Sequence, residues 1–213
     1  MRFEYGGVYK RFDMHGTMKL GNGWLKVQDI TEPTPSFMEG ADCVFVNPPS
    51  TIRTLREFYR KANTKVPWES YTDFIDRLFA VIDDITPRVA LVEAFPSNRD
   101  RCLELMRYRY PHVREYSVEF KGAYGVCWIV QGSEEETDLH LDRLKECEVV
   151  EALCDSGVFE TIANPMMGLG EVGRCAYNHG MGFVGTEMNP KRLAVLIDYI
   201  TRRRVVLEHE SRV

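Results

Sequence analysis

The sequence has no long apolar run, no close pair of cysteines and no excess of positive charge. A membrane-spanning helix needs about 18–20 apolar residues, so the first absence argues against a membrane protein. Zinc ligands usually come in close pairs, so six scattered cysteines and five unclustered histidines predict no metal site. The formal net charge of −5 argues against a protein that coats nucleic acid by bulk charge.

The composition that remains is that of an ordinary globular protein, with 44% hydrophobic and 28% charged residues. At roughly 100–200 residues per domain, the 213 residues predict one domain over residues 1–213. The first residues do not resemble a signal peptide, and scattered cysteines suit a reducing compartment, so we expect the protein in the cytoplasm.

Apolar runs of strand length alternate with amphipathic helical segments along the chain. The predicted strands are residues 24–30, 42–46, 88–95, 113–120, 124–131, 159–163 and 182–186, and the predicted helices are residues 51–62, 73–85, 98–109, 142–154, 171–179 and 190–203. One antiparallel hairpin, at residues 113–131, interrupts the alternation. The pattern predicts a three-layer α/β sandwich with a mainly parallel sheet, in which ligands bind beyond the carboxyl ends of the strands.

A glycine turn follows the predicted strand 159–163, with the sequence NPMMGLG at residues 164–170. Gly168 and Gly170 allow the backbone to approach a ligand closely and to turn sharply into a helix. The next strand ends at Glu187, near the ~20-residue spacing expected between a glycine loop and a ribose-binding acid. Because a short glycine motif is a weak signal, an ordinary strand-to-helix turn with a capping acid explains these residues equally well.

A second turn, Asn47-Pro48-Pro49, follows the buried strand 42–46. Two prolines stiffen the backbone and remove donors, which leaves carbonyl oxygens free to face a cleft. The Asn47 side-chain oxygen and a proline carbonyl can both accept from one exocyclic amino group, which would align its lone pair with an electrophilic methyl group. Taken alone, a Pro-Pro pair is more often a rigid connector.

The two turns together resemble the amino-group DNA methyltransferases that use S-adenosylmethionine. Those enzymes carry [DNS]-P-P-[YFW] at the catalytic turn and a D-P-F-x-G-x-G-like cofactor turn. Here the two turns read NPPS, and NPMMGLG followed by FVGTEMNPKRL. The catalytic turn comes first, which is the permuted order of the beta class. The resemblance covers roughly residues 24–50 and 88–203.

The resemblance implies a Rossmann-like methyltransferase fold, S-adenosyl-L-methionine as cofactor and double-stranded DNA as substrate, with adenine N6 favoured over cytosine N4. The implied site residues are Asn47, Pro48, Pro49 and Ser50 at the catalytic turn, and Asn164, Pro165, Met167, Gly168, Gly170, Glu187 and Asp29 around the cofactor. Glu187 would bind the ribose. Asp29 would lie near the adenine ring, although a turn cap explains this residue equally well.

Three features depart from the family pattern. Ser50 replaces an aromatic residue that stacks on the extruded base, a contact worth about 1–3 kcal/mol, so Phe58, Tyr59 or Trp68 would have to take its place. Asn164 replaces an acid of the cofactor turn, and a neutral amide contributes less to holding a cationic ligand. Residues 51–87 leave room for a small insert of two helices as a target-recognition element, not for a large recognition domain.

The first of these two helices offers cations for phosphate contact. Arg53, Arg56, Arg60 and Lys61 begin directly after the catalytic turn, where DNA would have to lie, although a solvated helix face is a slightly better explanation of such a stripe. A domain of this size has little surface for gripping a duplex, so we expect a homodimer. Its compactness would also suit a phage genome, in which case the compartment is the host cytoplasm.

Two alternatives stay open at this point. Ser50, Asn164 and the negative net charge would also fit a catalytically degraded, methyltransferase-like protein with a binding or structural role. The small recognition region and the negative charge would fit a methyltransferase that acts on RNA, a protein or a small amine.

Overall fold

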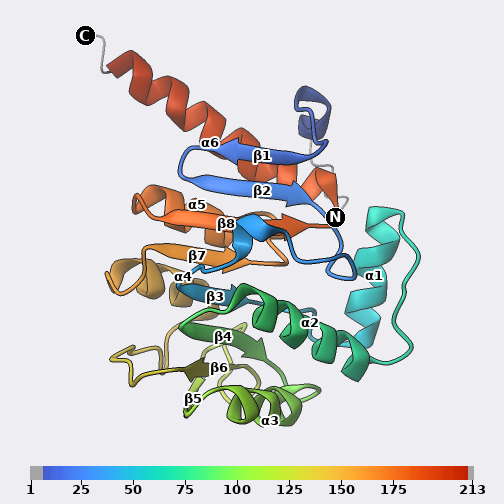
Figure 1. Ribbon diagram of the computed structural model, residues 1–213, viewed down its shortest axis with the longest axis vertical. Coiled ribbons are helices and arrows are strands. Elements are labelled where there is room, and N and C mark those ends of the chain that lie inside the picture. Colours follow the sequence, from blue (N-terminus) through green and yellow to red (C-terminus); the bar gives the residue numbers. More distant parts are fainter. Residues whose placement is uncertain (1–6, 211–213) are drawn as a thin grey trace.

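The computed structural model describes residues 7–210, with side chains described up to residue 203, and residues 1–6 and 211–213 lie outside the described part. The chain forms one eight-stranded sheet between two layers of helices (Figure 1). The strands are β1 (Thr17–Leu20), β2 (Gly23–Val27), β3 (Cys43–Val46), β4 (Val89–Ala94), β5 (His112–Ser117), β6 (Trp128–Ser133), β7 (Thr161–Asn164) and β8 (Gly182–Glu187). Their order across the sheet is β1-β2-β8-β7-β3-β4-β6-β5. The predicted α/β fold class is confirmed.

The five central strands, from β2 to β4 in that order, are parallel to one another. At one edge, β5 and β6 form the antiparallel hairpin that the sequence predicted. At the other edge, β1 and β2 form a second hairpin that was not predicted. None of the four residues of β1 is buried, and the strand lies between glycines, so no apolar run marks it. Gly21 adopts a φ of 59° in the tight turn between the two strands.

The helices divide equally between the two faces of the sheet. Buried side chains of α1 (Ile52–Ala62), α2 (Tyr71–Ile85) and α3 (Arg99–Arg109) form one core with the sheet, and those of α4 (Glu146–Asp155), α5 (Glu171–Asn178) and α6 (Pro190–Glu210) form the other. Two short 3-10 helices, Val8–Arg11 and Ser36–Met38, lie outside this pattern. Strand β3 supplies both cores, because Cys43 and Phe45 face one and Val44 and Val46 face the other. A strand buried on both faces reads as a continuous apolar run, which is why it was predictable.

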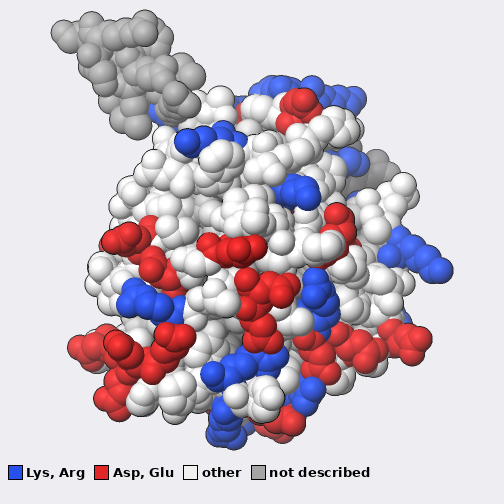
Figure 2. All heavy atoms as spheres, viewed as in Figure 1, with Lys and Arg blue, Asp and Glu red and all other residues white. Residues whose placement is uncertain are grey.

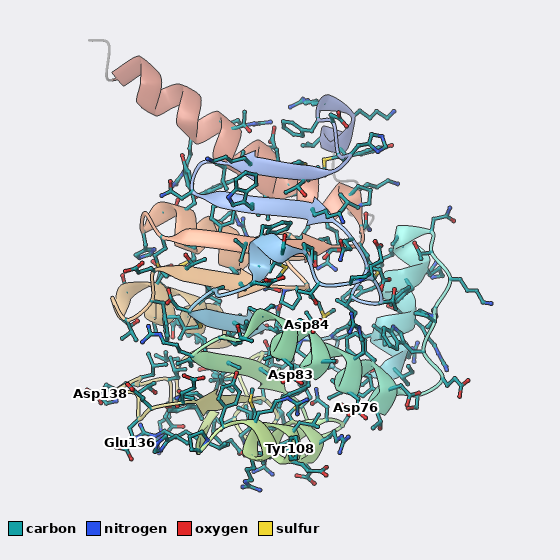
Figure 3. The ribbon with its side chains drawn as sticks, in the orientation of Figure 1. Asp76, Asp83, Asp84, Tyr108, Glu136 and Asp138 are labelled. Atoms are coloured by element: carbon teal, nitrogen blue, oxygen red, sulfur yellow. The ribbon has the colours of Figure 1, made fainter. Side chains whose placement is uncertain are left out.

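The outer face of the α2–α3 layer carries charges of both signs. Figure 3 labels Asp76, Asp83 and Asp84 on α2, and Figure 2 shows acidic side chains spread over the lower half of this view. Arg101 and Arg109 of α3 pair with Asp76 and Asp83 at 2.8 and 2.6 Å. Half-exposed pairs of this kind contribute little to stability, so the apolar face of α2 holds the layer in place.

The chain changes direction across the sheet between β7 and β3, which are neighbours. From β7 the chain passes through α5 to β8 on one side, and from β3 it passes through α1 and α2 to β4 on the other side. Ligands of open α/β sheets bind at this type of switch point, beyond the carboxyl ends of the strands. In Figure 1, α1 stands at the edge toward which the parallel strands run. None of the described helices is both long and apolar enough to cross a membrane.

Candidate functional site

A cavity of about 340 Å³ opens at the switch point. Its lining includes every residue that the sequence assigned to the catalytic turn and the cofactor except Gly170: Asp29, Asn47, Pro48, Pro49, Ser50, Asn164, Pro165, Met167, Gly168 and Glu187. These residues follow neighbouring strands in sheet order, so the cavity extends along the carboxyl edge of the sheet from β2 to β4. Its volume lies in the range of roughly 300–1,000 Å³ that small-molecule sites occupy.

The glycine turn after β7 is built from residues that adopt the left-handed conformation. Gly168 and Gly170 have φ values of 61° and 83°, and the Met167 N–H donates to the Thr186 carbonyl of β8 at 2.8 Å. Gly170 does not line the cavity. A Cβ atom at this position would lie 2.4 Å from the Cβ of Leu196 in α6, so Gly170 permits the close packing of α5 against α6.

Replacing Gly170 with alanine should therefore destabilise the fold more than replacing Gly168. A left-handed alanine costs roughly 1–2 kcal/mol and overpacking a further 1–3 kcal/mol, so we expect a loss of about 2–5 kcal/mol in urea unfolding. Gly168→Ala is the matched control, because its Cβ would meet only the flexible end of Arg192, at 2.9 Å. Equal losses in the two variants would contradict the packing role of Gly170.

Glu187, the last residue of β8, is held in place by the turns on both sides of it. One carboxylate oxygen accepts from the Gly168 N–H at 2.8 Å and the other from the Asn189 N–H at 2.9 Å. Burial raises the pKa of Glu187, while Arg192 and the two backbone donors lower it. Each oxygen keeps a second lone pair, so the carboxylate can accept further hydrogen bonds from a ligand in the cavity.

The Asn164 side chain stabilises the backbone conformation of its own turn. Its side-chain oxygen accepts from the Met166 N–H at 2.8 Å, and the residue is 1% exposed. The Asn164 amide therefore fixes the backbone of the turn, at the position where the family that this chain resembles has an acid. Negative charge is available elsewhere in the lining, which contains the carboxyl groups of Asp29, Glu146, Glu171 and Glu187.

Asp29 lies two residues beyond the end of β2, where it caps a turn and also lines the cavity. Its side-chain oxygen accepts from the Thr31 N–H at 2.9 Å, which caps a turn, and the residue also lines the cavity. The same oxygen accepts from the Tyr59 hydroxyl of α1 at 3.0 Å, and the Trp68 indole donates to that hydroxyl at 2.9 Å. This chain of hydrogen bonds holds α1 against the cavity wall.

Two hydroxyl groups from other segments hold the backbone of the catalytic turn, and the acceptors of the turn that line the cavity remain free. The Tyr71 hydroxyl of α2 donates to the Pro49 carbonyl, and Ser97 donates to the Ser50 carbonyl. Neither the Asn47 side chain nor the Pro48 carbonyl has a hydrogen-bond partner among the described residues, and both residues line the cavity. The turn therefore offers two free acceptors on a fixed backbone. Sequence reasoning missed Tyr71 and Ser97 because both come from elsewhere in the chain.

Aromatic side chains surround the catalytic turn even though Ser50 is not one. Of the three candidates near it in sequence, Phe58 and Tyr59 line the cavity, whereas Trp68 does not. Phe95, just after β4, and Phe120, between β5 and β6, also line it and pack edge to face with ring centroids 5.2 Å apart. Only the sheet order brings Phe120 to this site, so its position in the sequence carried no signal.

Glu93 is the most unusual group in the lining. It follows Val92, which pairs with Val46 of β3, so it stands level with Asn47 on the neighbouring strand. The residue is 3% exposed, and one carboxyl oxygen has no hydrogen-bond partner among the described residues. Burial, followed by the nearby charge of Glu146, raises the pKa of Glu93 to about 8. In the sequence, Glu93 is a single acid within an apolar run, and this pattern does not indicate that the residue lines a cavity.

The raised pKa of Glu93 predicts a specific dependence of stability on pH. The folded chain keeps the Glu93 proton up to about pH 8, whereas the unfolded chain releases it near pH 4.5. The free energy of unfolding should therefore fall as pH rises between these values, with a slope that approaches about 1.4 kcal/mol per pH unit. Glu93→Gln removes the ionisable group. In urea unfolding, the stability of this variant relative to the wild type should therefore rise steadily from pH 5 to pH 8. A constant difference over that range would contradict the buried, uncharged Glu93.

The basic residues of α1 lie outside the cavity but beside it. Arg53, Arg56, Arg60 and Lys61 are exposed, and none of the four forms an ion pair with a described acid. Helix α1 begins two residues after Ser50, with Thr51 capping it through a 3.2 Å hydrogen bond from the Thr54 N–H. The structure thus places Arg53 and Arg56 in the half of α1 that begins at the catalytic turn, and Arg60 and Lys61 in the last turn of the helix.

The comparisons with known proteins identify the fold. No known family model matches the sequence, and no curated protein does so either. Among solved structures, a candidate DNA modification methylase from Thermus thermophilus matches with a TM-score of 0.62 and 15% identity, over 84% of this chain and 94% of that chain. The chain has a methyltransferase fold.

Two further solved structures agree with this conclusion. M1.HpyAVI matches with a TM-score of 0.57 and 10% identity, over 83% of this chain and 97% of that one. The cytosine-N4-specific PvuII DNA methyltransferase matches with a TM-score of 0.57 and 12% identity, over 88% and 94%. The Thermus protein and M1.HpyAVI have both also been solved with S-adenosyl-L-methionine or SAM bound. At these identities the matches establish the shared fold, and what this chain binds must be argued from its own cavity.

Proposed function

We propose that this chain is an S-adenosyl-L-methionine-dependent DNA methyltransferase that modifies the exocyclic amine of a base. Adenine N6 is the amine we propose first, and cytosine N4 presents the same chemistry. We treat residues 1–213 as a single catalytic domain. The observation that carries the proposal is that one cavity contains both the Asn47-Pro48-Pro49 turn and the glycine turn, on neighbouring strands.

The lining of the cavity fits the cofactor. Glu187 is already oriented to accept from ribose hydroxyls, and the Gly168 backbone lies open to a ligand. The carboxyl groups of Asp29, Glu146, Glu171 and Glu187 in the lining suit a sulfonium cation, which compensates for the neutral Asn164. When bound, the cofactor supplies an electrophilic methyl group.

The catalytic turn fits the target amine. The Asn47 side-chain oxygen and the Pro48 carbonyl would accept its two hydrogens, which aligns the nitrogen lone pair with the methyl group. Tyr71 and Ser97 hold the turn, so little reorganisation is needed when the amine arrives. Phe95 and Phe120 lie on the β4 side of Asn47, away from Glu187, and offer apolar contact to a base extruded from the duplex.

The two alternative functions are weighed by the same features. A degraded, non-catalytic protein was suggested by Ser50 and Asn164, but the free acceptors at Asn47 and Pro48 and the additional aromatics leave a site suited to transfer. Transfer to RNA, a protein or a small amine is favoured by the net charge of −5. The uncommitted cations of α1, the helix that begins at the catalytic turn, favour a nucleic acid.

A labelled-methyl transfer assay distinguishes these functions. The purified protein would be incubated with radiolabelled S-adenosylmethionine and, separately, duplex DNA, RNA and a protein extract. We expect label in DNA above the other two. Label only in RNA or protein would replace DNA as the substrate, and label in none of them, from folded protein, would support the non-catalytic alternative. Light scattering on the same sample tests the predicted homodimer.

Replacing Arg53, Arg56 and Arg60 together with glutamine should weaken DNA binding and its dependence on salt. Each lost phosphate contact lowers the slope of log affinity against log salt by about 0.9, so the decrease should be about two to three units if all three contact phosphate. Arg107→Gln is the control, since Arg107 is also exposed but lies on α3 and not on α1. An unchanged slope in the triple variant would place the DNA elsewhere.

A further inference from the structure

Five side chains with metal-ligating atoms meet at the far ends of α4 and α5. They are Glu151, Cys154 and Asp155 of α4, and Cys175 and His179 at the end of α5. The ligand atoms of Cys154, Cys175 and His179 all lie within 4.8 Å of one another, and so do those of Glu151, Asp155 and His179. None of the five lines the cavity, which touches only residues nearer the first turns of these helices.

The spacing on each helix explains the cluster. Residues three and four apart share a helix face, so Glu151, Cys154 and Asp155 point the same way from α4. Cys175 and His179 are likewise four apart, with His179 capping the end of α5. The sequence predicted no metal site because it has no close pair of cysteines, and the groups of this cluster come from two helices that packing brings together.

The contacts within the cluster are those of a site whose ligands carry protons. The Cys175 thiol donates to Glu151 at 3.0 Å and lies 3.7 Å from His179 Nδ1. A cation bound tetrahedrally at about 2.0–2.3 Å holds its ligand atoms roughly 3.3–3.8 Å apart, a range that includes the Cys175–His179 separation and lies slightly above the Cys175–Glu151 one. His179 Nδ1 also lies 2.9 Å from the Cys175 carbonyl oxygen, a gap too short for a metal ion, so metal binding requires the imidazole to give up this hydrogen bond and move off the carbonyl.

The burial of the cluster suits a structural metal with an entry path. Cys154 and Cys175 are 5% and 7% exposed. The side chains of Glu151 and Asp155 are more than half exposed, so a hydrated cation can reach the cluster from their side. His179 Nε2 lies 2.8 Å from Asp155, and a carboxylate that holds the second ring nitrogen is the usual partner of a metal-bound histidine.

We propose that Cys154, Cys175, His179 Nδ1 and Glu151 form a Zn²⁺ site, with Asp155 as a positioning residue on His179 Nε2. Two thiolates, an imidazole and a carboxylate are a donor set that zinc favours, and these four come from two helices. Bound zinc would clamp α4 to α5 at one end. Because the first turns of both helices line the cavity, the clamp would also stabilise the site.

Zinc titration of the reduced, chelator-treated full chain tests the proposal. We expect one zinc per chain, a raised melting temperature and, with Co²⁺ in place of zinc, thiolate-to-metal charge-transfer absorption. Cys175→Ser and His179→Gln should each lower zinc affinity more than ten-fold, and Asp155→Asn should lower it about 10- to 100-fold. Cys147→Ser is the control, because Cys147 is an exposed cysteine of α4 outside the cluster.

His179 is partly exposed, so His179→Gln should still fold, which circular dichroism of the metal-free variant checks. Absence of zinc binding by the reduced wild type would overturn the proposal. Binding that His179→Gln and Cys175→Ser both retain would overturn it as well, because the zinc would then lie elsewhere. These readouts do not depend on methyl transfer, so they test the zinc site independently of the proposed function.

Discussion

Replacing Asn47 with alanine should abolish methyl transfer to DNA while leaving cofactor binding unchanged. The Asn47 side chain has no partner among the described residues and faces the cavity on a turn held by Tyr71 and Ser97. Without its oxygen, one of the two acceptors that align the amine is lost. Removing one pre-oriented hydrogen-bonding group from an active site costs about 10²–10³ in rate, so single-turnover transfer should fall at least that far.

Asn47→Asp provides the matched control for this experiment. Aspartate keeps an acceptor oxygen at the same position and occurs at this place in the resembling family, so the variant should retain much of the activity. Calorimetry of both variants with S-adenosylmethionine should give wild-type affinity. Full transfer by Asn47→Ala would remove Asn47 from the catalytic role, and loss of cofactor binding would show that the turn supports the cofactor instead.

Replacing Glu187 with alanine should remove measurable cofactor binding. A hydrogen bond to a charged group contributes about 1.5–3 kcal/mol, so losing two ribose contacts should weaken binding by about 10²–10⁴. The substitution also leaves the Gly168 and Asn189 N–H groups without their acceptor, which loosens the turn on both sides. Calorimetric titration with S-adenosylmethionine and with its demethylated product measures the effect.

Glu187→Gln separates the ligand contact from the support of the turn. Glutamine keeps one acceptor oxygen and the size of the side chain, so it should bind the cofactor with intermediate affinity. Urea unfolding of both variants shows whether the fold persists. Undiminished binding by folded Glu187→Ala would contradict the assignment of the ribose to Glu187.

The parts of this site that could be predicted from sequence are those whose signal is local. The Asn47-Pro48-Pro49 turn and the glycine turn each lie within a few residues of a strand end, and both strands are largely buried. Their apolar runs and breaker residues marked them without knowledge of the fold. Both turns line one cavity because their strands are neighbours and parallel.

The parts that could not be predicted depend on the order of strands in the sheet. Phe120 reaches the cavity from the hairpin at the sheet edge, and Glu93 is level with Asn47 only because β4 lies beside β3. Gly170 illustrates the opposite error, because its motif suggested a ligand contact and its surroundings show packing against Leu196. The cysteines and histidine of the α4–α5 cluster were likewise separated in sequence and joined by helix packing.

Identifying the methylated base in treated DNA tests whether the site transfers a methyl group to an exocyclic amine. DNA would be incubated with the protein and S-adenosylmethionine, digested to nucleosides and analysed by mass spectrometry. The proposed acceptors at Asn47 and Pro48 would activate an exocyclic amine, and the described lining of the cavity contains no cysteine that could attack a ring carbon. We expect N6-methyladenine, or N4-methylcytosine in its place, and the loss of either product in Asn47→Ala. Formation of 5-methylcytosine, or of no methylated base by folded protein that binds the cofactor, would contradict it.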